Sequence, residues 1–302
     1  MVAGSAAGSV AEALSASVAA LAAAGVGTPR LDAELLLAEA TGRERAALIA
    51  EPDAPVDAGA ARSFGAMVRR RVGREPVAYI LGRRGFRHLE LRSDRRALIP
   101  RPETELLVEV ALELQPASVL DVGTGSGAIA LALADEMPEI EVVATDTSPA
   151  ALALARENAE ALGLAGRVSF FLGSLPPPRG FDLVLANLPY VRDGDWGGLE
   201  PEITRFEPRE ALLGGKDGLD PIRGLLAALR SGRIASAVAL EVGEGQAKEV
   251  EGLLAAAGFG PTTVRRDLAG IERVVIGRRD DRLAADGRHT SETGQPRGVG
   301  GG

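Results

Sequence analysis

The 302-residue sequence has no cysteine and only two histidines, His88 and His289, which lie far apart in the chain. Without cysteine there are no disulfides and no thiolate ligands, and two distant histidines do not make a usual zinc site. We therefore expect no metal centre. The sequence also lacks the run of about eighteen apolar residues that a membrane-spanning helix needs. We therefore expect no transmembrane segment and no membrane partner.

Basic residues are in the minority, with 34 Lys and Arg against 42 Asp and Glu and a formal net charge of −8. Proteins that bind long nucleic acids through phosphates carry clustered Lys and Arg, so this balance disfavours a direct nucleic-acid partner. The Ala-rich start has no basic residue before Arg30, and Glu12 interrupts it. This charge pattern is unlike that of a secretory signal, which favours a cytoplasmic location.

Residues 1–75 are predicted to form a helical domain. The spacing of apolar residues and the capping signals predict four helices, over residues 10–24, 29–41, 44–50 and 57–72. Thr28 and Pro29 are typical of a helix start, and Gly25 and Gly42 of helix ends. The fourth helix leads into a basic cluster of Arg69, Arg70, Arg71 and Arg74. We interpret this cluster as a solvated helix end favoured by the helix dipole, with a docking surface as the alternative.

Residues 76–97 are predicted to form a β-hairpin linker. Val77, Tyr79 and Leu81 alternate with other residues before Gly82, which is typical of a strand that runs into a turn. We expect this linker to connect the helical domain to the larger domain that follows.

The segment from Leu98 to Glu105 contains a proline on each side of Arg101. The two prolines stiffen a loop that leads into a predicted helix over residues 106–114. Two interpretations stay open at this point, a simple proline-rich helix entry and a loop that lies against a ligand.

From residue 118 onward, strands and helices alternate, which predicts an α/β domain with a doubly wound sheet and right-handed crossovers. Strands are expected over residues 118–122, 141–145, 168–172, 181–186 and 237–242, with two closing antiparallel strands over 262–267 and 273–277. Helices are expected over residues 128–134, 149–162, 220–229 and 246–257. Residues 191–218 show no periodicity and suggest a lid or substrate loop. We assign residues 98–279 to this domain and residues 280–302 to a disordered tail.

A glycine-rich segment, Asp121-Val122-Gly123-Thr124-Gly125-Ser126-Gly127-Ala128, connects the first strand of this domain to the next helix. Glycines allow the backbone to turn tightly and to approach a ligand closely. Asp146 ends the second strand, where a carboxylate is placed to bind ribose hydroxyls. No Lys-Ser/Thr follows the glycines, which excludes a kinase-type P-loop. A nicotinamide dinucleotide and S-adenosylmethionine both remain possible ligands of such a loop.

The apolar run Phe181 to Ala186 predicts a strand buried on both faces, and it stops at Asn187-Leu188-Pro189-Tyr190. Pro189 has no N–H to donate within a central strand, so these four residues are expected to form a loop at the strand's carboxyl end. Ligands of open α/β sheets bind at this edge, although a plain proline turn is the structural alternative. A dehydrogenase would need an acid or base here, and neither histidine is placed to supply one.

The tetrapeptide resembles the Asn-Pro-Pro-Tyr motifs of methyltransferases that act on planar nitrogens. Six segments narrow this resemblance: Glu75 to Gly82, Leu98 to Glu105, Asp121 to Gly127, Arg205 to Arg209, Asp217 to Asp220 and Arg266 to Gly270. Together they resemble the PrmC/HemK family, which methylates the glutamine of the Gly-Gly-Gln motif in peptide chain release factors. The resemblance covers about residues 28 to 278.

This resemblance implies a Rossmann-like methyltransferase sheet that uses S-adenosyl-L-methionine, with the N-terminal helical domain recognising the substrate. It implies that the partner is the Gly-Gly-Gln loop of class 1 release factors. The residues that it implies for the acceptor site are Asn187, Leu188, Pro189 and Tyr190. The residues that it implies for the cofactor are Gly123, Thr124, Gly125, Ser126, Gly127, Asp146, Leu175 and Asn187.

In this interpretation the Asn187 side-chain oxygen and the Leu188 carbonyl each accept one N–H of the substrate amide, and Tyr190 stacks on it. The sequence departs from the family at two of these positions. Leu188 stands where the family usually has proline, and Leu175 stands near where it often has an aromatic residue beside the adenine.

Two other functions are weighed against this one. An adenine N6-methyltransferase acting on nucleic acid would use the same tetrapeptide and the same cofactor, but the acidic charge and the family-specific segments disfavour it. A binding or scaffold protein with a vestigial sheet is disfavoured because the glycine loop and Asn187 are both intact.

Overall fold

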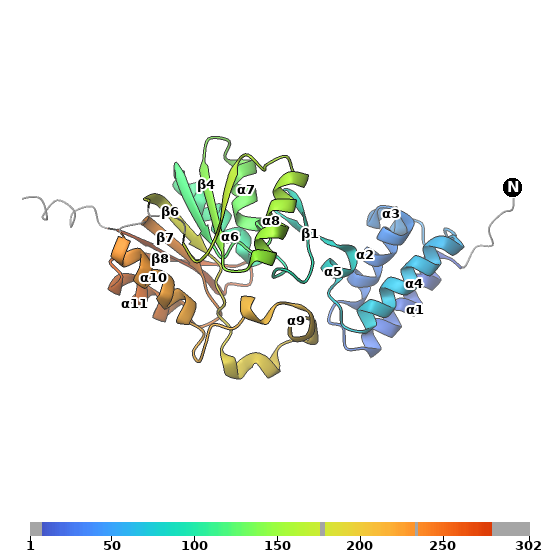
Figure 1. The fold of residues 1–302 in the computed structure, drawn as a ribbon. Helices are drawn as coiled ribbons and strands as arrows, with labels where there is room; N and C mark the ends of the chain where they lie inside the picture. Colours follow the sequence, from blue (N-terminus) through green and yellow to red (C-terminus); the bar gives the residue numbers. More distant parts are fainter. Residues whose placement is uncertain (1–7, 176–178, 233–234, 280–302) are drawn as a thin grey trace, which may run out of the picture.

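The computed structural model describes residues 8–175, 179–232 and 235–279. Its first part is a bundle of four helices, α1 (Val10–Ala23), α2 (Pro29–Thr41), α3 (Arg45–Ala50) and α4 (Ala58–Val72), drawn in blue in Figure 1. These helices confirm the predicted ones to within a residue or two. Leu14, Leu36 and Phe64, from three different helices, are buried in a common core. The Asp57 side chain caps α4 by accepting hydrogen bonds from two backbone amides.

The linker differs from its prediction at its start. The expected strand over Val77 and Tyr79 is wrong, because Val77–Leu81 forms the short helix α5, which Gly82 ends in the left-handed region (φ 72°). Val77, Ile80 and Leu81 have helical spacing and pack on the core of the bundle, whereas Tyr79 points elsewhere. A segment of five residues is too short to distinguish the helical spacing of apolar residues from the alternating spacing of a strand. The hairpin follows, as the antiparallel strands β1 (Arg83–Phe86) and β2 (Leu89–Arg92).

The second part of the chain is built on a seven-stranded sheet with the strand order β5-β4-β3-β6-β7-β9-β8. Five neighbouring strands are parallel: β3 (Ser118–Val122), β4 (Glu141–Asp146), β5 (Val168–Leu172), β6 (Phe181–Ala186) and β7 (Ala235–Glu241). The last two, β8 (Thr262–Arg266) and β9 (Glu272–Arg278), pair antiparallel, as expected. This topology confirms the predicted doubly wound sheet.

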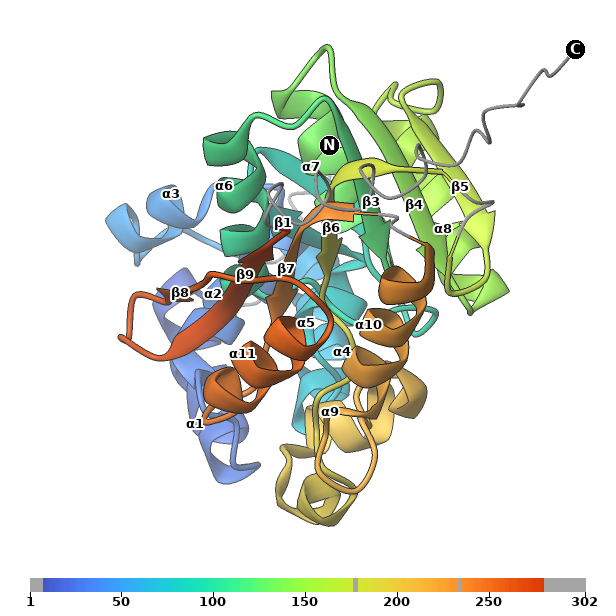
Figure 2. The same cartoon turned by 90° about the vertical axis from the view of Figure 1, so that its left-hand side faces the viewer.

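Helices cover both faces of the sheet (Figures 1 and 2). One face carries α6 (Glu105–Leu114), α7 (Ala128–Glu136) and α8 (Pro149–Ala161), and the other carries α10 (Asp220–Gly232) and α11 (Ala247–Ala256). Alternate residues of each central strand enter the two cores, with Val119 on the first face and Leu120 on the second. Both faces of the inner parallel strands are therefore covered, which explains their mostly apolar sequences, whereas Phe171 and Leu172 of the edge strand β5 are exposed.

The segment over residues 191–218, expected to be irregular, contains three short helical turns. These are the 3-10 turn η2 (Asp193–Gly198), helix α9 (Pro201–Phe206) and the 3-10 turn η3 (Arg209–Ala211). Pro201 starts α9, and Pro208 directly precedes η3. Each turn is too short to leave a periodic signal in the sequence. Figure 1 shows α9 on the side of the sheet domain that faces the helical bundle.

Two arginines of the basic cluster at the end of α4, Arg71 and Arg74, belong to an ion-pair network, so the interpretation as a solvated helix end is wrong for them. Arg69 and Arg70 are exposed, as that interpretation expects. Arg71 is only 5% exposed, and its Nε and Nη2 atoms lie 2.7 Å from carboxylate oxygens of Asp32 and Glu202. Arg74 binds both Glu200 and Glu202. Glu202 belongs to α9, so the network ties the helical bundle to the segment over residues 191–218.

The tail predicted over residues 280–302 lies outside the described residues. The division at residues 75, 97 and 279 stays a prediction, although the bundle and the sheet have separate cores. None of the helices described is both long enough and apolar enough to cross a bilayer.

We expect Arg71→Met to lower the free energy of unfolding by about 3–5 kcal/mol, because it leaves the buried carboxylate of Asp32 without its ion-pair partner and Glu202 with Arg74 alone. Arg69→Met is the matched control, since Arg69 is exposed on the same helix and should change stability by less than about 1 kcal/mol. Urea unfolding followed by circular dichroism measures both. Equal effects of the two substitutions would contradict a buried network.

Candidate active site

The glycine loop between β3 and α7 is held in shape by the end of β4. Gly123, Gly125 and Gly127 all have positive φ angles (74°, 58° and 86°), which residues with a Cβ rarely adopt. The Gly123 N–H donates to the backbone oxygen of Thr145 at 2.8 Å, and the Gly125 N–H donates to Asp146 Oδ2 at 2.9 Å. The loop conformation therefore depends on the carboxylate that was predicted to bind ribose.

The buried side chain of Asp121 also stabilises the glycine loop. Its Oδ2 atom accepts a hydrogen bond from the Thr124 hydroxyl at 2.6 Å, and its side chain has no exposed surface. Burial raises the pKa of Asp121 to about 7, against the opposing effect of the bond from Thr124. The carboxyl group of Asp121 thus stabilises the conformation of the glycine loop from inside the protein.

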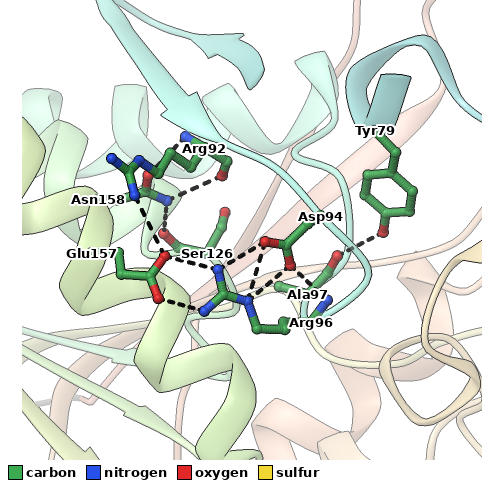
Figure 3. A network of polar contacts seen from close by, with 8 residues as sticks. All are labelled: Tyr79, Arg92, Asp94, Arg96, Ala97, Ser126, Glu157 and Asn158. Atoms are coloured by element: carbon green, nitrogen blue, oxygen red, sulfur yellow. Dashed lines mark hydrogen bonds and ion pairs between the residues drawn. The ribbon is translucent and has the colours of Figure 1, made fainter. Parts of the chain in front are cut away.

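Asn158 of α8 fastens the other end of the glycine loop to the hairpin linker (Figure 3). Its Nδ2 group donates to the carbonyl oxygens of Ser126 at 2.9 Å and Arg92 at 3.2 Å, and its Oδ1 accepts from the Arg92 N–H at 2.7 Å. The side chain is buried, so these bonds do not compete with water. The position of β2 is therefore coupled to that of the glycine loop.

The stretch after β2 is fixed in a similar way. Arg96 forms paired hydrogen bonds with Glu157 at 2.6 and 2.8 Å and also binds Asp94 (Figure 3). The Tyr79 hydroxyl donates to the Ala97 carbonyl oxygen at 2.9 Å. Arg96 and Ala97 both line the cavity described next. Helix α5 and the hairpin thus help to shape the site.

A cavity of about 520 Å³ lies between the glycine loop and the loop after β6, within the size range of small-molecule sites. Nine of the predicted site residues line it: Gly123, Thr124, Gly125, Ser126, Asp146, Leu175, Asn187, Leu188 and Pro189. The cavity combines a glycine-backbone wall, apolar side chains and charged side chains, which are the carboxylates of Asp146 and Glu210 and the guanidinium groups of Arg96 and Arg101. These are features that suit a nucleoside carrying a polar amino-acid tail, such as S-adenosylmethionine.

Two predicted residues do not line this cavity. Gly127 lies behind the loop, where a Cβ would come within 3.0 Å of Leu131. The Tyr190 carbonyl oxygen accepts a hydrogen bond from Gln246 Nε2 at 3.0 Å, and its ring lies beside Gly243. Burial raises the pKa of Tyr190 to about 12. The stacking of Tyr190 on a substrate amide stays a prediction.

The proline-flanked loop over residues 98–105 forms another wall of the cavity. Buried Glu207 holds it, because its Oε2 accepts from the Ile99 N–H at 3.0 Å and its Oε1 binds the Arg101 guanidinium. Of the two interpretations left open for this loop, the cavity favours the one in which it lies against a ligand.

Asn187 is oriented by Thr104, the last residue of the 3-10 turn η1 (Pro102–Thr104). Its Nδ2 group donates to Thr104 Oγ1 at 3.0 Å, and no hydrogen bond among the described residues engages its Oδ1. The Thr104 side chain also lies beside the Glu241 carboxyl group at the end of β7. The Asn187 side chain lines the cavity with its oxygen available as an acceptor.

Sequence reasoning missed Thr104, Glu241 and Gln246. Glu241 had a usable signal, because it is the only ionisable residue in the otherwise apolar strand β7 and is 2% exposed. Burial raises the pKa of Glu241 to about 7; nearby Glu103 raises it as well, whereas the bond from Thr104 lowers it, as do Arg273 and Arg101. No local pattern revealed Thr104, whose partners are distant in sequence.

Glycines after α9 pack directly on the acceptor loop. A Cβ at Gly214 would collide with the Pro189 carbonyl oxygen, and one at Gly218 with that of Tyr190. The loop after β6 therefore has its backbone fixed from two sides. Within the described ranges, no group of three or more His, Asp or Glu side chains is placed to hold a metal ion.

Comparisons with known proteins agree with this architecture. The model of the methyltransferase small domain matches residues 102–198, and that of the PrmC N-terminal domain matches residues 12–82. The crystal structure of the hMettl16 catalytic domain superposes with a TM-score of 0.52 at 14% identity, covering 62% of this chain and 74% of that one. The fold and the site define a Rossmann-like S-adenosylmethionine-dependent methyltransferase.

Sequence relatives narrow the class further. Release factor glutamine methyltransferases from Rhodospirillum rubrum and Geobacter sulfurreducens are 42% and 43% identical to this chain. Both alignments cover 85% of this chain, and they cover 81% and 92% of the length of the two relatives. The enzyme of Xylella fastidiosa strain Temecula1 is 45% identical over 86% of this chain and 97% of its own length. The chain belongs to the release factor glutamine methyltransferase family.

The raised pKa of Glu241 predicts a pH-dependent stability. Between its ordinary value of 4.5 and about 7, the carboxyl is ionised in the unfolded chain but protonated in the folded one. Stability from this group is therefore full below 4.5 and is lost as pH rises through about 7. We expect the unfolding free energy of Glu241→Gln, minus that of the unsubstituted protein, to increase from about pH 5 to about pH 8.

Urea titrations at several pH values measure this difference. Glu244→Gln is the control, because Glu244 is exposed nearby and its substitution removes the same charge. The slope with pH should appear for Glu241→Gln and not for Glu244→Gln. A constant difference for both variants would refute the assignment.

Proposed function

We propose that this enzyme methylates the side-chain amide nitrogen of the glutamine in the Gly-Gly-Gln motif of class 1 peptide chain release factors. Family membership supports a release factor glutamine as the substrate. The observation that carries the proposal is the orientation of Asn187, whose Nδ2 is occupied by Thr104 while its Oδ1 is left to accept. An acceptor at the edge of the cofactor cavity suits an amide NH₂ group.

The chain's own residues divide into two groups in this proposal. The backbone of residues 123–126 would hold the amino-acid part of the cofactor, Asp146 its ribose hydroxyls and Leu175 its adenine. S-adenosylmethionine, when bound, supplies an electrophilic methyl group on its sulfonium. Asn187 to Tyr190 hold the acceptor.

A glutamine amide is a poor nucleophile because its nitrogen lone pair is delocalised into the carbonyl group. The Asn187 Oδ1 and the Leu188 carbonyl each accept one of the two N–H groups, which fixes the nitrogen with its lone pair directed at the methyl donor. Holding the reacting atoms about 3–3.5 Å apart supplies most of the rate enhancement. Tyr190 stacks on the flat amide and keeps it in plane.

Proton release needs no strong base in this mechanism. Once the nitrogen carries the methyl group it is positively charged and acidic, and it loses one proton to water. Leu188, in place of the family's usual proline, still offers a backbone carbonyl. Its side chain lies against the glycine loop, where a Cβ on Gly123 would be 3.1 Å from Leu188 Cδ2.

An adenine N6-methyltransferase is not favoured, because the relatives that match most of the chain are release factor enzymes. The net charge of −8 likewise supports a partner other than nucleic acid. Release factors act on ribosomes, so the proposed substrate places the reaction in the cytoplasm.

We expect Asn187→Ala to lower the rate of methyl transfer by about 100-fold or more, because the amide nitrogen loses one of its two anchors. Mass spectrometry of the Gly-Gly-Gln peptide from a treated release factor measures the rate. A release factor with the motif glutamine replaced by alanine is the substrate control and should gain no methyl group.

Calorimetric titration with S-adenosylmethionine should give Asn187→Ala nearly the unsubstituted affinity, because Asn187 mainly serves the acceptor. Loss of cofactor binding in proportion to activity would refute this division of roles. A methyl group found elsewhere on the release factor would refute the proposed target.

A further inference from the structure

Thr104 occupies the N-cap position of α6 but does not cap it. A threonine at this position usually accepts a hydrogen bond from a backbone amide of the first turn. Here the Thr104 side chain makes no such bond, and its backbone is already helical (φ −66°, ψ −20°). Thr104 is 4% exposed, so water does not replace the missing partner. Its hydroxyl oxygen instead accepts from Asn187 Nδ2 and lies beside the Glu241 carboxyl group.

The chemistry of the Asn187 amide fixes the direction of its hydrogen bond with Thr104. The Asn187 Nδ2 group can only donate, so Thr104 Oγ1 accepts from it. The single hydroxyl hydrogen of Thr104 is then free to donate, and the Glu241 carboxyl is the acceptor beside it. Donation from Thr104 to Glu241 gives the order Asn187 to Thr104 to Glu241, from donor to acceptor at each step.

This order decides which end of the Asn187 amide faces the cavity. The two orientations of an asparagine amide have nearly the same shape, so hydrogen-bond partners choose between them. With Nδ2 bound to Thr104, the oxygen faces the cavity. In the opposite orientation an NH₂ group would face the substrate's own NH₂ group, where two donors meet and no bond forms.

We propose that Glu241 and Thr104 are positioning residues that hold the Asn187 amide oxygen toward the substrate glutamine. The inference rests on the proposed role of Asn187 in binding that amide. Neither residue is assigned contact with the substrate, and both act through Asn187.

The environment of Glu241 supports a role beyond stability. Its side chain is 2% exposed, and its Oε2 atom has no hydrogen-bond partner among the described residues. Burying a carboxyl group in this way is unfavourable, and an apolar residue would suit the strand better. The charged groups that face it are Glu103, Arg101 and Arg273. We call the hydrogen-bond chain from Asn187 through Thr104 to Glu241 the relay. A protonated carboxyl group still has a carbonyl oxygen that accepts, so the relay can form at pH values below and above the pKa of Glu241.

The test uses two pairs of substitutions in the full-length enzyme. Thr104→Val removes the hydroxyl with little change of shape, and Thr104→Ser keeps it. Glu241→Leu removes the acceptor, and Glu241→Gln keeps an acceptor oxygen. We expect Thr104→Val and Glu241→Leu to lower kcat for release factor methylation by about 10- to 100-fold. Thr104→Ser and Glu241→Gln should restore most of the rate.

Two further kinds of measurement distinguish a changed orientation of Asn187 from a general loss of structure. Calorimetry should show the same S-adenosylmethionine affinity for all four variants, and KM for the cofactor should not change. The double variant Thr104→Val/Glu241→Leu should be no slower than the slower single variant, because both break one chain of hydrogen bonds. Multiplied losses would indicate two independent effects and would overturn the relay.

Other outcomes are equally decisive. The relay is overturned if Glu241→Gln is as slow as Glu241→Leu. It is also overturned if Thr104→Val and Glu241→Leu both keep the full rate while Asn187→Ala is inactive. In that last case the proposed function stands. If Asn187→Ala itself methylates release factor normally, the proposed acceptor site fails instead. Loss of cofactor affinity in step with kcat would show a structural role and would also overturn the relay.

Discussion

The parallel pairing of β3 with β6 sets the distance between the two halves of the site. Val122 pairs with Ala186, so the next residues, Gly123 and Asn187, leave the sheet together at one edge. The two loops then pack so closely that a Cβ on Gly123 would be 3.1 Å from Leu188 Cδ2. A slip of one residue would turn each strand's side chains to the opposite face and break both cores. Burial of the sheet therefore fixes the relative position of the glycine loop and the loop after β6.

Segment 191–218 connects this edge to the helical bundle. Glu202 of α9 binds Arg71 and Arg74 of the bundle, and Glu207, just after α9, binds Ile99 and Arg101 of the loop that lines the cavity. Since both carboxylates are largely buried, neither contact is easily replaced by water. The bundle is thus joined to the cavity wall by two ion-pair clusters, one near the start of α9 and one just after its end. The helical bundle is thereby held in a fixed relation to the cavity.

The fold was predictable wherever a local pattern was long enough. The apolar strand at Phe181 to Ala186 and the glycine loop carried signals that the sheet confirms. Val77–Leu81 was too short to separate a helical from an alternating period. The roles of Arg71 and Thr104 depend on partners at Glu202 and Asn187, more than 80 residues away in both cases. Contacts of this kind arise from the tertiary fold and leave no trace in neighbouring residues.

The site as a whole depends on orientation more than on reactive groups. The described cavity wall includes no histidine, and the carboxylate of Asp146 is engaged by the Gly125 amide. Selectivity for an amide must then come from the number and direction of acceptors. A buried carboxyl such as Glu241 weakens the strand that carries it, but the low dielectric around it also strengthens the hydrogen bond that it accepts. In the proposed role of Glu241, the same burial that lowers stability therefore makes the orientation of Asn187 more definite.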